Sequence, residues 1–229
     1  MTPARGWFFP GMAVAIVLTV LVGFGPTYYF RTFTDASALP RLTHVHGLAF
    51  TAWVLLLTTQ VFLVAGGRRD IHRRLGAVGG ALALMMVGLG VLVALATARR
   101  DIAAGQRDDA LGFLIIPLGD ILAFAALVAG ALALRARRET HRRLMLLATL
   151  AILPAAIGRI PWLGGTGGII VYFLAMIAAA PVYDWRARGR PHPVSLWGGI
   201  GVFLFALGRF LASESAWWRA IATRLVSEG

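Results

Sequence analysis

Apolar residues run along this chain in blocks of about twenty, separated by short polar stretches rich in arginine. A helix needs about twenty apolar residues to cross the roughly 30 Å hydrocarbon layer of a bilayer, and these blocks are too continuous for barrel strands. The pattern predicts seven transmembrane helices, at residues 7–27, 44–66, 73–97, 110–134, 142–161, 166–184 and 194–212. We therefore expect an all-α polytopic bundle that forms a single integral membrane domain over residues 1–229.

The two ends of the chain need separate interpretation. The first apolar block is longer than the apolar core of a signal peptide and carries no small-residue cleavage motif, so we interpret it as a retained helix. The tail at 213–229 mixes apolar and charged residues. Its neighbouring Trp217 and Trp218 indicate a short helix at the membrane interface.

Arginine supplies all 22 basic side chains, and the formal net charge is +12. These arginines lie in short loops between apolar blocks. With the N-terminus placed in the cytoplasm, 13 arginines lie on the cytoplasmic side and 9 on the other side. Because cytoplasmic loops carry an excess of positive charge, we expect a cytoplasmic N-terminus and an outer C-terminus. The arginines then contact lipid head groups, and the charge does not indicate nucleic acid as a partner.

Cysteine, lysine and asparagine do not occur in the chain. Without cysteine the protein has no disulfide, no thiolate metal site and no iron–sulfur cluster. Without lysine it cannot form a Schiff base with retinal or pyridoxal phosphate, and it has no P-loop lysine. The retinal-binding function that a seven-helix count brings to mind is thus excluded in its ordinary form.

A short motif occurs twice. RRDIHRRL at 68–75 and RRETHRRL at 137–144 match at six of eight positions, and each begins a predicted helix. The motif predicts repeated helical hairpins joined by similar cytoplasmic turns. His72 and His141 occupy the same position in the two copies. One interpretation gives both histidines an interfacial, structural role, and the other makes them ligands.

Polar side chains inside apolar blocks are the best pointers to function, because burying them costs several kcal/mol unless they are partnered. Asp120 is the only acid deep within a predicted helix, and it is our candidate catalytic or proton-handling acid. Arg159, Arg209 and Tyr28 lie near the predicted outer ends of their helices. Together they predict a hydrated or ligand-filled cavity in the outer half of the bundle. The alternative is an Asp120–arginine ion pair that only holds helices together.

Four histidines are candidate metal ligands, since imidazole is the commonest metal ligand and the usual axial ligand of haem b. His44 and His46 begin the second helix on the outer side, and the intramembrane amide of Gln60, on the stripe of His46, is a further candidate binding group. Two positions apart on a helix, His44 and His46 diverge unless the helix starts near 46. His72 and His141 lie on the cytoplasmic side, about 30 Å away. Either there are two sites, or one pair is structural.

The motifs HVHGLAFTAWVLLLTTQ, RRDIHRRLG and RRETHRRLM resemble those of a group of uncharacterised bacterial membrane proteins with seven helices. The resemblance covers most of residues 40–215. The HRRLM segment is also similar to small membrane proteins of cytochrome oxidase maturation. The resemblance implies a protein of the bacterial inner membrane near haem or copper chemistry, and it transfers no activity to an individual residue.

Three functions stay open from the sequence. The first is a metal- or haem-binding protein of redox chemistry or oxidase maturation, with haem b or a transition metal ion as cofactor. The second is a transporter or receptor for an anionic or lipid-like ligand held by Arg159 and Arg209. The third is a metal-free enzyme on a lipid or isoprenoid substrate with Asp120 as general acid. Membrane lipids are the expected partners, together with a homo-oligomer or a respiratory complex.

Overall fold

The computed structural model describes residues 7–33 and 38–227, and within these residues it contains helices and no strand. The helices are α1 (Phe8–Phe24), α2 (Arg41–Ala65), α3 (Arg69–Ala103), α4 (Arg107–Phe113), α5 (Ile115–Ala133), α6 (Arg138–Ala151), α7 (Pro154–Ile157), α8 (Thr166–Arg188), α9 (Gly199–Ala212) and α10 (Ala216–Ser227). Short π- and 3₁₀-helices lie between them, namely η2 (Gly25–Tyr29), η3 (Arg31–Phe33), η4 (Pro161–Leu163) and η5 (Val194–Gly198).

Seven helical spans are long and apolar enough to cross a membrane, as the sequence predicted. They are Phe8–Tyr29, Arg41–Ala65, Arg69–Ala103, Arg107–Ala133, Arg138–Ile157, Thr166–Arg188 and Val194–Ala212. The all-α polytopic fold is therefore confirmed. The spans at 107–133 and 138–157 are at least half buried in their most apolar windows, against 22–39% for the other five, so these two form the centre of the bundle.

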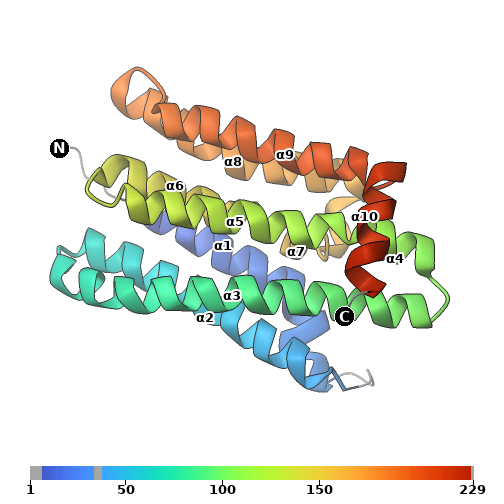
Figure 1. The fold of residues 1–229 in the computed structure, drawn as a ribbon. Coiled ribbons are helices and arrows are strands. Elements are labelled where there is room, and N and C mark those ends of the chain that lie inside the picture. The colour runs from blue at the N-terminus through green and yellow to red at the C-terminus, as the bar shows by residue number, and fades with distance from the viewer. Residues whose placement is uncertain (1–6, 34–37, 228–229) are drawn as a thin grey trace.

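The three arginine-rich turns, at 66–68, 134–137 and 189–193, gather at one end of the bundle, which we call the arginine-rich end (Figure 1). This placement follows from the alternating direction of the helices. The opposite end carries the turn between α3 and α4, and α10 lies across it (Figure 1). Which end faces the cytoplasm stays a prediction from the arginine counts.

The predicted tail helix is present as α10, but its two tryptophans differ in environment. Trp217 is exposed, as an interface residue is expected to be. Trp218 is buried instead, and its indole Nε1 donates a hydrogen bond of 2.8 Å to the carbonyl oxygen of Leu111 in α4. Trp218 thus helps to fasten the tail to α4.

Two prolines lie inside membrane spans, where a proline removes one helical hydrogen bond. Pro154 divides its span, because α6 ends at Ala151 and a separate short helix, α7, starts at Pro154. Pro117 has no N–H for the carbonyl oxygen of Phe113, and its span is interrupted at Leu114, between α4 and α5.

One close helix crossing depends on a glycine. A methyl group on Gly23 of α1 would lie 2.2 Å from the carbonyl oxygen of Ala156 in α7, and a backbone atom cannot move aside cheaply. We expect Gly23→Ala to lower the free energy of unfolding in detergent by about 1–3 kcal/mol. Gly11→Ala in the same helix is the matched control, because nothing lies within 4 Å of its added methyl group. Equal unfolding curves for the two variants would contradict the crossing.

Candidate functional site

The two histidines of the repeated motif meet at the arginine-rich end. His72 lies in the first turn of α3 and His141 in the first turn of α6. Their ring centres are 6.4 Å apart and the ring planes cross at 82°. Both side chains are half-buried. The repeat thus places two imidazoles, 69 residues apart in the sequence, beside one another.

One imidazole of this pair is held in a fixed orientation. His141 Nδ1 lies 2.8 Å from the carbonyl oxygen of Ala131, which belongs to the last turn of α5. As a donor it satisfies a carbonyl that has no partner within its own helix. The Nδ1–H tautomer leaves the lone pair on Nε2, and histidines that bind metal ions are commonly anchored in this way.

Two polar atoms beside the pair have no partner. Gln60 of α2 donates a hydrogen bond of 3.2 Å from Nε2 to the carbonyl oxygen of His72. Its Oε1 and the Nδ1 of His72 are both buried without a hydrogen-bond partner. Because a buried polar atom without a partner costs roughly 1–3 kcal/mol, these two atoms point to a missing ligand or water.

The two rings are close to the separation that a shared ion needs. Metal–nitrogen bonds of about 2.0–2.1 Å place the centres of two imidazoles on one tetrahedral ion roughly 5 Å apart. The ring centres of His72 and His141 are 6.4 Å apart, so binding one ion requires the two rings to approach by about 1 Å. Across the described ranges, 7–33 and 38–227, no three His, Asp or Glu side chains form a metal-binding group. Any ion here would therefore need the Gln60 amide oxygen or water to complete its shell.

The other candidate histidines do not converge. His44 is exposed, and its carbonyl oxygen accepts a hydrogen bond of 3.1 Å from the Tyr28 hydroxyl. His46 stacks on Phe50, with ring centres 4.2 Å apart. These contacts lie at the end of the bundle remote from His72, as the predicted topology requires. A metal role for His44 and His46 stays a prediction.

Asp120 forms an ion pair with an arginine. An Asp120–arginine pair was the alternative to a ligand-filled cavity in the interpretation of the sequence. Arg209 Nη2 of α9 donates a hydrogen bond of 2.7 Å to Asp120 Oδ1 of α5. Both residues are buried, at 7% and 6% exposure. Arg209 also donates to the carbonyl oxygens of Ile116 and Phe205. Asp120 thereby fastens α5 to α9, and its proposed role as an acid stays a prediction.

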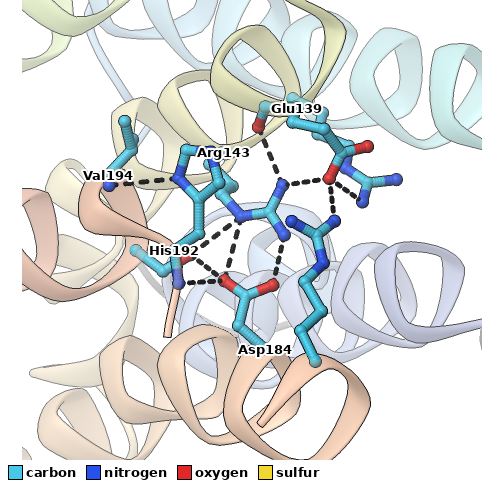
Figure 2. A network of polar contacts seen from close by, with 8 residues as sticks. Glu139, Arg143, Asp184, His192 and Val194 are labelled. Atoms are coloured by element: carbon cyan, nitrogen blue, oxygen red, sulfur yellow. Dashed lines mark hydrogen bonds and ion pairs between the residues drawn. The ribbon is translucent and has the colours of Figure 1, made fainter. Parts of the chain in front are cut away.

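The structure adds a second buried acid to Asp120. Asp184, near the end of α8, is fully buried, and it forms an ion pair with Arg143 of α6, which is 1% exposed. Arg143 Nε lies 3.0 Å from both Asp184 Oδ2 and Ser195 Oγ, and the Ser195 hydroxyl donates to Asp184 over 2.6 Å. Figure 2 shows Arg143 between Glu139 and Asp184.

A second carboxylate extends this network to the surface. Glu139 Oε2 accepts hydrogen bonds from Arg142, Arg143 and Arg188. On the other side, the backbone N–H of His192 donates to Asp184 over 3.3 Å, and the N–H of Val194 donates to His192 Nδ1 over 3.2 Å (Figure 2). Burial and the Arg143 guanidinium lower the pKa of His192, which agrees with a neutral Nδ1 that accepts a hydrogen bond.

The sequence held a weak signal for this network. Asp184 ends an apolar block directly before an arginine-rich turn, a position that is usually at the interface. Arg143 was interpreted as one of the arginines that contact lipid head groups. Only the packing of α8 and η5 against α6 distinguishes it from its exposed counterpart in the first repeat, Arg74.

Two hollows of the described residues lie away from the predicted outer cavity. One hollow of about 150 Å³ lies between α3, α4 and α10, and a shallow one of about 390 Å³ lies along α2 near Arg68. Neither is lined by Asp120, Arg159 or a histidine.

Compared with family models, curated proteins and solved structures, the chain shows no match. The resemblance drawn from the histidine motifs therefore stays a prediction. The functional argument has to proceed from the geometry of the bundle alone.

Proposed function

We propose that this polytopic helical membrane protein binds a divalent transition metal ion between His72 and His141. The observation that carries the proposal is the pair of neighbouring imidazoles, whose centres are 6.4 Å apart and need to approach by only about 1 Å to share an ion. The anchored Nδ1 of His141 and the partnerless His72 Nδ1 and Gln60 Oε1 support it. The ligands would be the two imidazoles and the Gln60 amide oxygen.

The proposed ligands, two imidazole nitrogens and an amide oxygen, favour some metal ions over others. Imidazole nitrogen suits Zn²⁺, Ni²⁺, Co²⁺ and Cu²⁺, whereas Ca²⁺ and Mg²⁺ prefer oxygen shells and Cu(I) prefers sulfur. Arg142 and Arg143, which follow His141 in α6, both donate to Glu139, so part of their positive charge is neutralised. With few protein ligands, the ion would keep open positions and act as a Lewis acid for water or a small anion.

Metal titration of the purified protein tests the proposal. We expect the protein in neutral detergent to bind one Co²⁺ per chain, seen as a visible absorption band and by elemental analysis. His72→Ala and His141→Ala are expected to remove this binding. Gln60→Leu is expected to weaken it by about 10- to 100-fold, the usual cost of losing a supporting polar group. Binding should also weaken as the solution is made acidic, because protons compete with the metal ion for the imidazole nitrogens.

The double variant His44→Ala/His46→Ala is the matched control, since it removes two histidines at the opposite end of the bundle. We expect it to bind Co²⁺ as the unchanged protein does. Loss of binding in this variant, with full binding in His72→Ala, would place the site at the other end and overturn the proposal. A Soret band in the purified protein would show haem instead.

A further inference from the structure

A second site is indicated by Arg159, which lies near the membrane interface. Arg143 pairs with Asp184, and Arg209 pairs with Asp120. Within residues 7–33 and 38–227, no ion pair joins Arg159 to a carboxylate. Exposed arginines of the turns, such as Arg74, also lack such a partner, and Arg159 differs from them because its guanidinium packs over an aromatic ring.

Arg159 follows α7, two residues after the end of the membrane-length span Arg138–Ile157. Its Nη1 donates to the carbonyl oxygen of Ala155, and its guanidinium carbon lies 4.7 Å from the centre of the Phe24 ring. The side chain reaches the surface, yet the atoms packed around it desolvate the guanidinium and lower the pKa of Arg159. The remaining N–H donors are available to an anionic acceptor.

His46 of α2 adds a polar group beside the same end of α1, where Phe24 contacts Arg159. The Tyr28 hydroxyl, one turn after Phe24, donates to the carbonyl oxygen of His44, and the Tyr28 ring lies against Gly47. The His46 ring is held against Phe50, and its Nδ1 is buried without a hydrogen-bond partner. An imidazole can donate to or accept from a ligand at this nitrogen. Arg159 and His46 therefore combine a positive charge with a partnerless nitrogen, beside the aromatic rings of Phe24 and Phe50.

We propose that Arg159 and His46 form a binding site for the anionic phosphate or carboxylate group of an amphiphile. The guanidinium would donate two parallel charge-assisted hydrogen bonds to the oxygens of the anionic group, and His46 would supply one further hydrogen bond. The aromatic rings and the surrounding apolar helices suit the alkyl chain. Trp162, three residues after Arg159, is 72% exposed, which is typical of the head-group level. This site lies at the opposite end from His72 and His141 and is independent of the metal proposal.

The test uses two probes, dodecyl phosphate and inorganic phosphate, titrated into the purified protein in a neutral detergent. We expect dodecyl phosphate to raise the thermal midpoint and to shift the side-chain NMR signals of Arg159 and His46. Arg159→Gln is expected to weaken this binding by about 10- to 100-fold, the loss that follows from removing a charge-assisted bidentate contact. Arg159→Lys, which keeps the charge and loses the fork, should give an intermediate affinity.

Arg107→Gln is the matched control, since Arg107 is an exposed arginine at the same end of the bundle. We expect its affinity for dodecyl phosphate to be unchanged. Equal effects of both probes would support the site with a free anion as its ligand, whereas a response to dodecyl phosphate alone would support a lipid-like ligand. No binding of either probe, or equal affinity in Arg159→Gln and Arg107→Gln, would overturn the inference.

Discussion

Replacing Arg143 by methionine is expected to cost about 3–5 kcal/mol of unfolding free energy, because it leaves the buried Asp184 carboxylate without its cation. Among the described residues, Asp184 would keep the Ser195 hydroxyl and the backbone N–H of His192 as its donors. Neither carries a charge. Equilibrium unfolding in mixed detergent micelles, followed by circular dichroism, measures the loss. The turn at 189–193 should also become more sensitive to protease, since the network holds it against α6.

The repeat supplies the control for this experiment. Arg74 occupies the position of Arg143 in the first copy of the motif, and it is exposed. Arg74→Met should therefore change stability by no more than about 0.5 kcal/mol. The double variant Arg143→Met/Asp184→Leu should be more stable than Arg143→Met, because no buried charge is left alone. A similar cost for Arg143→Met and Arg74→Met would contradict the buried ion pair.

The contrast between these two arginines shows the limit of the sequence. Both copies of the motif were correctly expected to begin helices, and hydropathy was enough to find the seven spans. The two eight-residue copies are too similar to indicate which of them lies at the centre of the bundle. The second copy is covered by α8 and η5, so its arginine is buried, and the first copy is not covered. Burial here follows from tertiary packing rather than from local sequence.

The positions of the histidines in the bundle could also be predicted only in part from the sequence. Helix lengths were sufficient to separate His44 and His46 from His72 and His141 across the membrane. That His72 and His141 face one another required knowledge that α3 and α6 both pack on α5. Gln60 was singled out as a polar residue on the stripe of His46, but it lies beside His72, because α2 and α3 run back along one another.

The two buried ion pairs have a common consequence for the bundle. Arg143–Asp184 joins α6 to α8 near the arginine-rich end, and Asp120–Arg209 joins α5 to α9 toward the other end. The hairpin of α8 and α9 is therefore fastened to the central hairpin of α5 and α6 by one charged contact near each end. Inside a lipid bilayer the hydrophobic effect gives helices little tendency to associate. Polar contacts such as these two ion pairs therefore contribute more to fixing the positions of the helices.

Asp120→Leu is the second substitution with a large expected effect, about 3–5 kcal/mol of unfolding free energy. It leaves the Arg209 guanidinium, 7% exposed, with backbone carbonyls as its only acceptors among the described residues. Adding Arg209→Ala to Asp120→Leu should recover part of the loss, since the unpaired charge is then gone. Denaturant unfolding of the two single variants and the double variant gives the coupling energy directly.

The same pair depends on the glycine that precedes Asp120. A methyl group on Gly119 would lie 2.0 Å from Arg209 Cδ, so Gly119→Ala forces the arginine away from its carboxylate. We expect a loss of about 1–3 kcal/mol in the unchanged protein and almost none in the Arg209→Ala background, where the space is free. Gly208→Ala, next to Arg209 but with nothing within 4 Å of its added methyl group, should be neutral. If Gly119→Ala costs the same in both backgrounds, the glycine is needed for the helix itself and not for the approach of the arginine, and the ion pair does not depend on that close contact.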